Sequence, residues 1–103
     1  MVLRLLPEYI TRAELDGRIE DELPMLSHEH MAWWNRHRVE PFVVMDGEHP
    51  RFAVARDGDA VIYFDDSEDE FASCLLHDGR IGNAGLYGEL QSAVFGIIHY
   101  PPQ

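Results

Sequence analysis

The stretch that decides the fold is "PFVVMDGEHPRFAVARDGDAVIYFDD", Pro41–Asp66. It holds three runs rich in β-branched and aromatic residues: Phe42–Met45, Arg51–Ala55 and Ala60–Phe64. An Asp-Gly pair, Asp46-Gly47 or Asp57-Gly58, follows each of the first two runs. Such a pair between β-forming runs predicts a hairpin, because both central residues of the favoured turn need a positive φ. The stretch therefore predicts consecutive antiparallel strands.

The same device recurs downstream in "FASCLLHDGRIGNA", where Asp78-Gly79 predicts a further hairpin. The segment "GLYGELQSAVFGIIHY" then predicts a C-terminal helix, because apolar residues recur at helical spacing. Those residues are Leu86, Leu90, Val94 and Ile97.

Two helices are predicted before the strands. Thr11 and Glu14 have the spacing of a capping box, and Ile10 and Leu15 have that of a hydrophobic staple. An apolar stripe at helical spacing follows in Leu15, Ile19 and Leu23, and Pro24 ends it. In "LSHEHMAWWNRHR" Ser27 is expected to begin the second helix. The predicted order is α-α-β-β-β-β-α, an α+β fold in which helices cover one face of an antiparallel meander of about four strands.

The chain has 103 residues, of which 46% are hydrophobic, so we expect one domain over residues 1–103. Nineteen acidic residues against eight basic ones give a formal charge of −11. Such a field repels phosphates and anionic lipids, so direct nucleic-acid or membrane binding is not expected. It favours capture of a basic protein partner, although an acidic surface also serves solubility alone. The oligomeric state stays open.

The single cysteine, Cys74, excludes an internal disulfide and lies in an apolar run, where a thiol is usually a small hydrophobe. The N-terminal stretch "MVLRLLPEYI" is too short for the apolar region of a signal peptide. We therefore expect a reduced, cytoplasmic protein.

The most acidic stretch is "YFDDSEDEF", Tyr63–Phe71, which contains five carboxylates. Asp65, Ser67 and Asp69 match the first ligand positions of an EF-hand loop, but Glu70 and Leu76 stand where glycine and glutamate are needed. The six histidines include His30 and His37 on one face of the second helix, with no HExxH pair. The sequence thus predicts neither a metal site nor a cofactor, and no GxSxG elbow or phosphate-binding loop is present.

An acidic rim with an aromatic anchor fits a docking surface for another protein better. The expected contact residues lie at both ends of the strand Ala60–Phe64, with one tryptophan from the second helix beside them. They are Asp57, Asp59, Tyr63, Asp65, Asp66, Glu68, Asp69, Glu70 and Trp33. Neighbouring tryptophans diverge by about 100° on a helix, so one of Trp33 and Trp34 is expected to be exposed.

The segments "WWNRHRVEPFVV", "RFAVARDGDAVIYFDDSEDEF" and "DGRI" resemble small acidic bacterial immunity proteins, which are encoded beside polymorphic or type VI secreted toxins. The earlier "DELPMLSHEHMAWW" is similar to the start of the SMI1/KNR4-like immunity superfamily, where a Leu-Pro step separates two helices. The resemblance spans about residues 20–81. It implies a protein without chemistry of its own that covers the active site of one toxin.

The working hypothesis is a non-enzymatic inhibitor that binds a cytoplasm-acting toxin with a basic cleft, a nuclease first among the candidates. Two alternatives stay open. One is a small metal- or carboxylate-dependent enzyme that uses His30, His37 and nearby acids. The other is an acidic regulatory adaptor or nucleic-acid mimic, which differs from the first hypothesis only in its partner.

Overall fold

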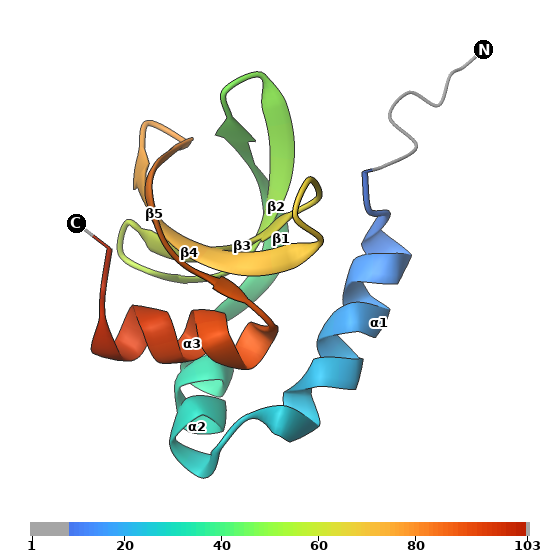
Figure 1. Ribbon diagram of the computed structural model, residues 1–103, viewed down its shortest axis with the longest axis vertical. Coiled ribbons are helices and arrows are strands. Elements are labelled where there is room, and N and C mark those ends of the chain that lie inside the picture. The colour runs from blue at the N-terminus through green and yellow to red at the C-terminus, as the bar shows by residue number, and fades with distance from the viewer. Residues whose placement is uncertain (1–8, 103) are drawn as a thin grey trace.

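The computed structural model describes residues 9–102, in which a five-stranded barrel packs against three α-helices (Figure 1). Residues 1–8, most of the N-terminal stretch for which no signal peptide is expected, lie outside the described part. In chain order the elements are α1 (Arg12–Glu22), the 3-10 turn η1 (Leu23–Met25), α2 (His28–His37), β1 (Arg38–Asp46), β2 (His49–Asp57), β3 (Ala60–Asp65), β4 (Glu70–His77), β5 (Arg80–Gly88) and α3 (Leu90–His99).

The start signals predicted for the first two helices are confirmed. The Thr11 hydroxyl accepts a hydrogen bond from the Glu14 amide, and the Glu14 carboxylate accepts one from the Thr11 amide, which completes the capping box. The Ser27 hydroxyl accepts from the His30 amide and caps α2. Both helices thus begin where their side chains satisfy otherwise unpaired backbone donors.

The α+β class and the antiparallel meander are confirmed, but the described residues form five strands rather than about four. The three predicted runs and the hairpin at Asp78-Gly79 together account for all five strands, so the total of about four was one too low. In addition, β5 continues from Arg80 to Gly88, into the segment predicted to be helical. Leu86 therefore belongs to a strand, and α3 begins only at Leu90. Gly88 separates the two elements: its φ is 151°, and a Cβ there would lie 2.9 Å from the Ser92 side chain.

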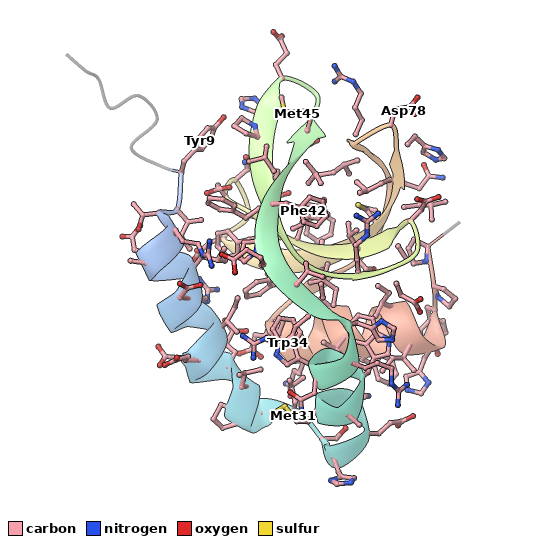
Figure 2. The ribbon with its side chains drawn as sticks, turned by 180° about the vertical axis from the view of Figure 1, so that it is seen from behind. Tyr9, Met31, Trp34, Phe42, Met45 and Asp78 are labelled. Atoms are coloured by element: carbon pink, nitrogen blue, oxygen red, sulfur yellow. The ribbon has the colours of Figure 1, made fainter. Side chains whose placement is uncertain are left out.

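The meander closes into a barrel, which the sequence did not predict. Neighbouring strands pair in chain order, and β1 returns to pair with β5 in parallel at Met45 and Arg80. The Met45 amide donates to the Gly79 carbonyl at 3.0 Å and supports this closure. Figure 2 shows Met45 and Asp78 at the rim of the barrel far from α2, whereas Trp34 lies at the end that the helices cover.

The three Asp-Gly pairs all lie at hairpin turns, but in two registers. Asp78 and Gly79 are both central turn residues with positive φ, as predicted. At the other two turns the glycine, Gly47 or Gly58, is the first turn residue and has a φ near 60°, while the preceding aspartate ends a strand. Asp57 thus ends β2, and only Asp59 of the predicted acidic pair lies within the turn.

Closure gives the protein two apolar cores, one inside the barrel and one between barrel and helices. Successive residues of β3 supply them alternately, because strand side chains point to opposite faces. Val61 and Tyr63 face the interior, whereas Ile62 and Phe64 face the helices. Both faces of β3 are buried, which explains its unbroken apolar sequence.

Helix α3 relies on α1 for its N-terminal cap. Glu89 occupies the cap position but makes no side-chain cap hydrogen bond. Instead, the buried carboxylate of Glu22, the last residue of α1, accepts a hydrogen bond of 2.6 Å from the Leu90 amide. Arg18 neutralises Glu22 from one turn earlier in α1. The contact fixes the end of α1 against the start of α3.

Candidate functional site

The acidic stretch predicted as the site begins at the end of β3 and crosses a four-residue turn into β4. The turn is built by the Asp65 carboxylate, whose Oδ1 accepts hydrogen bonds from the amides of Ser67 (2.9 Å) and Glu68 (3.2 Å). Asp69 closes the turn with a φ of 57°, a conformation that aspartate tolerates better than most residues. The aspartates of this stretch therefore shape the backbone as well as charging it.

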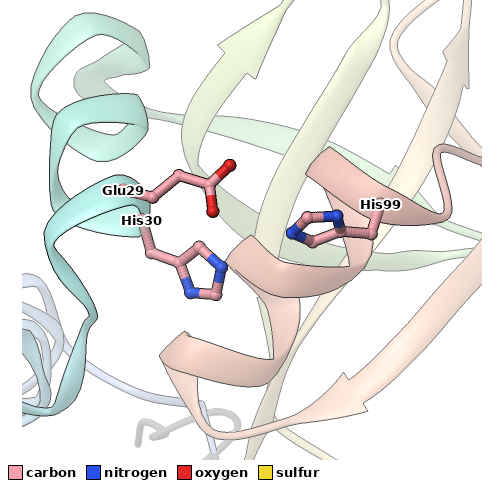
Figure 3. A group of neighbouring side chains, drawn as sticks. All are labelled: Glu29, His30 and His99. Atoms are coloured by element: carbon pink, nitrogen blue, oxygen red, sulfur yellow. The ribbon is translucent and has the colours of Figure 1, made fainter.

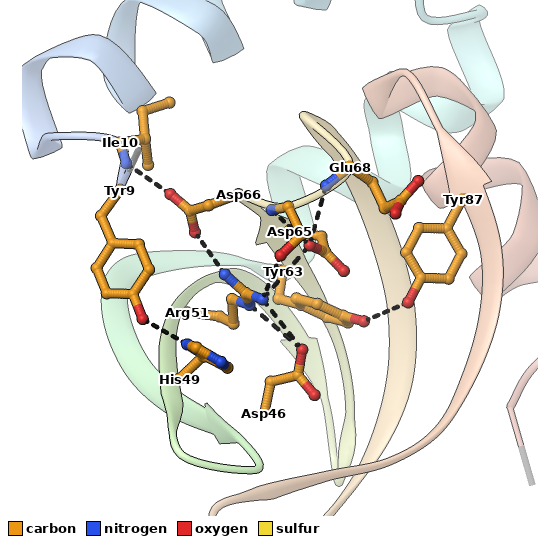
Figure 4. Close-up of polar contacts among 11 residues, drawn as sticks. Tyr9, Ile10, Asp46, His49, Arg51, Tyr63, Asp65, Asp66, Glu68 and Tyr87 are labelled. Carbon is orange, nitrogen blue, oxygen red and sulfur yellow. Dashed lines mark hydrogen bonds and ion pairs between the residues drawn. The ribbon is translucent and has the colours of Figure 1, made fainter. Parts of the chain in front are cut away.

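A buried arginine lies beneath this turn. The side chain of Arg51, from β2, is only 3% exposed and lies among three carboxylates (Figure 4). Its guanidinium nitrogens lie 3.3 Å from Asp46, 3.6 Å from Asp65 and 3.3 Å from Asp66, and it also donates to the Ser67 hydroxyl at 3.1 Å. Burial alone would lower the pKa of Arg51, but the surrounding carboxylates, Asp65 first among them, raise it. The arginine stays charged and holds the turn against the barrel.

The Arg51 cluster also contacts the first residues of the described chain, which lead into α1. The second oxygen of Asp66 accepts a hydrogen bond of 2.5 Å from the Ile10 amide, just before α1 (Figure 4). Beside it, the Tyr9 hydroxyl lies 2.7 Å from Nδ1 of His49 on β2. Asp66 thus joins the β3–β4 turn, the Arg51 cluster and the residues that lead into α1.

Three of the residues predicted to contact a partner, Tyr63, Asp65 and Asp66, have buried side chains. The side chains of Asp65 and Asp66 are 6% and 4% exposed, because they neutralise Arg51. Tyr63 lies inside the barrel, where its hydroxyl is 3.2 Å from that of Tyr87 (Figure 4). Burial, and then the hydrogen bond with Tyr87, raises the pKa of Tyr63. Tyr63 and Asp65 therefore belong to the interior of the protein, whereas Asp66 contributes to a groove wall while most of its side chain is engaged by Arg51.

The remaining predicted residues reach the surface to different degrees. Asp57, Asp59, Glu68 and Asp69 are exposed, and Glu70 is half-buried. Trp33 is also half-buried: it packs against the helix-facing core and stacks on His37 with ring centroids 4.6 Å apart. Its neighbour Trp34 is buried. The expectation that the two tryptophans differ is confirmed, but the less buried one is only partly accessible.

Asp69, an exposed acid of the β3–β4 turn, lines a groove that α1 completes. The groove has a volume of about 500 Å³, and its floor and walls combine aromatic, aliphatic and charged side chains. Its lining residues are Tyr9, Ile10, Glu14, Gly17, Arg18, Asp21, Phe64, Asp66 and Asp69. Four carboxylates and one guanidinium give this lining a formal charge of −3.

The α1 side of the groove was missed in the sequence, although a signal was present. Glu14, Arg18 and Asp21 follow one another at intervals of four and three residues, which places them on one face of a helix. Arg18 crosses the groove to Asp69, with Nη1 3.0 Å from the carboxylate and Nη2 2.9 Å from the backbone carbonyl. Asp21 is exposed, whereas Glu14 is held by the capping box, which lowers its pKa.

The structure also bears on the chemical alternatives. Cys74 lies inside the barrel, where burial raises its pKa to about 12, so its thiol is protonated at neutral pH. The two histidines predicted to share one face of the second helix have different surroundings: Nδ1 of His37 lies 3.2 Å from the Arg56 carbonyl, whereas His30 contacts Phe95 of α3. In the acidic turn, Ser67 and Asp65 face Arg51 while Asp69 faces Arg18, so these side chains do not converge as EF-hand ligands.

Comparisons with protein-family models, with curated proteins and with solved structures gave no match to this chain. The resemblance to immunity proteins therefore stays a prediction. No helix among residues 9–102 combines the length and the apolar character needed to cross a membrane.

Proposed function

We propose that this protein is a non-enzymatic inhibitor of the immunity-protein type, which binds a cytoplasm-acting toxin through the acidic groove between α1 and the β3–β4 turn. The observation that carries the proposal is the groove itself, which concentrates negative charge in a concave surface. Such surfaces attract basic groups and accelerate encounter with a positively charged partner.

The buried Arg51 cluster supports this assignment by fixing the groove. Asp66 lines the groove, and its carboxylate accepts hydrogen bonds from the Arg51 guanidinium and the Ile10 amide. The acidic wall therefore keeps its shape before any partner arrives, so little ordering entropy is lost on binding. A lysine or arginine on the rim of a toxin's nucleic-acid-binding cleft would meet Asp21 and Asp69 at the mouth of the groove.

The experiment that tests the proposal uses the product of the adjacent gene as the candidate toxin. Expressed alone it should arrest bacterial growth, and co-expression of this chain should restore growth. Association is then measured by surface plasmon resonance with a groove variant that carries Asp21→Lys and Asp69→Asn within the groove and Glu68→Lys beside it on the same turn. Asparagine is chosen at position 69 because it tolerates the positive φ there. We expect the association rate to fall about tenfold or more at low salt.

A matched control makes the same change in net charge elsewhere, with Glu20→Lys, Glu48→Lys and Asp78→Asn, all at exposed positions outside the groove. The control should associate at nearly the wild-type rate, and high salt should reduce the difference between the variants. Asp65 and Asp66 are left intact, because reversing them would place unneutralised cations around Arg51. Equal rates for the groove variant and the control would refute the groove assignment, and a chain that fails to restore growth would refute the function.

A further inference from the structure

A second cluster of chemically capable side chains lies away from the acidic groove, where the start of α2 meets the end of α3. Glu29 and His30 belong to the first turn of α2, and His99 is the last residue of α3. One ligand atom from each of the three lies within 4.8 Å of the others (Figure 3). Within residues 9–102 this is the only group of three such side chains that comes so close.

Phe95, which is 40% exposed, packs beside both imidazoles. Its ring centroid lies 4.6 Å from that of His99 and 5.9 Å from that of His30, and the two histidine rings are themselves 5.9 Å apart. Among the described residues, no hydrogen bond or ion pair engages the Glu29 carboxylate or the nitrogens of these two rings. The rings are thus oriented by packing while their donor atoms remain available.

The donor set selects the kind of ion. Two imidazoles and one carboxylate suit zinc and the neighbouring first-row transition metals, whereas calcium and magnesium prefer oxygen ligands alone. In a tetrahedral zinc site the donor atoms lie roughly 3.3 Å apart, so the three side chains must close by about 1.5 Å or less. Glu29 and His99 are exposed, and changes in their side-chain torsions can supply that movement.

We propose that Glu29, His30 and His99 bind one divalent transition-metal ion of the zinc type, with solvent at the remaining coordination position. The negative end of the α3 dipole lies at His99, and the chain carries a formal charge of −11, so both the local and the overall field favour a cation. The bound ion ties the first turn of α2 to the last turn of α3. This site does not depend on the acidic groove or on a toxin.

The test is a titration of the full chain, purified without a histidine tag, with zinc chloride in an isothermal calorimeter. We expect one ion per chain, and no comparable heat with magnesium or calcium chloride. His99→Gln and His30→Gln should each weaken zinc binding at least about tenfold, and Glu29→Gln should weaken it by a similar factor. The matched control is His28→Gln, an exposed histidine of the same helix that lies outside the cluster, and it should bind zinc as the wild type does.

Two results would overturn the proposal. One is the lack of saturable zinc binding at free concentrations below about 100 μM, the range expected for a site of any consequence. The other is equal weakening by His28→Gln and His99→Gln, which would show dispersed binding to surface histidines. Circular dichroism establishes that each variant is folded, and if His30→Gln unfolds, the comparison of His99→Gln with His28→Gln decides. Cobalt absorption gives an independent readout, since loss of a nitrogen ligand changes the visible spectrum.

Discussion

Pairs of aspartates lie near both ends of β3, but the two pairs differ in their exposure to solvent. At the β2–β3 end, Asp57 and Asp59 are exposed. At the β3–β4 end, Asp65 and Asp66 are buried around an arginine. The difference comes from the register of β2 against β3, in which Phe52 pairs with Phe64 and therefore brings Arg51 beside Asp65. Whether a cluster of aspartates is exposed or buried therefore depends on whether strand pairing places a cation beside it.

The largest effect is expected from removing that cation. Arg51→Met leaves three carboxylates without their buried partner and should lower the free energy of unfolding by about 3–5 kcal/mol. The matched change at the other end is Arg56→Met. Arg56 is exposed, donates to the Gly58 carbonyl and lies over the Phe42 ring, so its loss should cost about 1 kcal/mol or less. Urea denaturation measures the free energy of unfolding of both variants. Similar losses in the two would contradict the claim that only the β3–β4 end depends on a buried cation.

A smaller effect is expected from removing single carboxylates. Asp66→Ala loses both the ion pair with Arg51 and the hydrogen bond from the Ile10 amide, and should cost about 2 kcal/mol. Asp57→Ala, at an exposed position, should change stability by less than about 0.5 kcal/mol. Thermal unfolding followed by circular dichroism distinguishes these outcomes. A large loss in Asp57→Ala would reveal a structural role at the exposed end.

The barrel interior between the two ends should make the protein sensitive to alkali. The pKa of Cys74 is raised from 9.0 to about 12 in the folded state, and that of Tyr63 is also raised. Above about pH 9 the unfolded chain loses these protons first, so each group lowers stability by up to ~1.4 kcal/mol per pH unit until it ionises in the folded state. Cys74→Ala should make the urea midpoint fall less steeply between about pH 9 and pH 11. The cavity left by the substitution should lower the midpoint by the same amount at every pH and so leave this slope unaffected. An unchanged slope would show that the thiol does not contribute.

The smallest effect is expected at the exposed end. The double change Asp57→Asn and Asp59→Asn removes negative charge from a protein with a net charge of −11. Reduced self-repulsion should raise stability by a few tenths of a kcal/mol at low ionic strength, and about 1 M salt should abolish the gain. Destabilisation by the double change would instead mean that these carboxylates have favourable partners in the folded state.

Local features of the fold could be predicted from the sequence because they depend on residues that are close together in the chain. The Thr11–Glu14 capping box, the Ser27 cap and the glycines of the hairpins are of this kind. Closure of the barrel could not be predicted from the sequence, because it depends on strand curvature. This curvature brings Met45 to Arg80 across three intervening strands. The end of β5 was misread since Leu86 and Leu90 satisfy helical spacing by coincidence, with Gly88 between them.

The candidate site was proposed from composition, and the strand register changed which of its acids are exposed. The sequence located a concentration of acids around the β3–β4 turn, and the groove does lie there. Which acids stay exposed depends on Arg51, one of eight basic residues, and no local pattern identified it as a buried partner. The α1 wall needed the three-dimensional arrangement as well, because Asp21 and Asp69 are 48 positions apart and meet only through the docking of the helix.

The cap that Glu22 provides to Leu90 has a consequence for biosynthesis. The contact joins residues 68 positions apart, and α1 shares its apolar core with α3 through Leu15 and Ile19. In a chain emerging from the ribosome α1 is therefore made well before α3, and its contacts with α3 can form only after α3 has left the exit tunnel. The acidic groove, which needs α1 as a wall, is therefore complete only after α3 has been synthesised and α1 has docked.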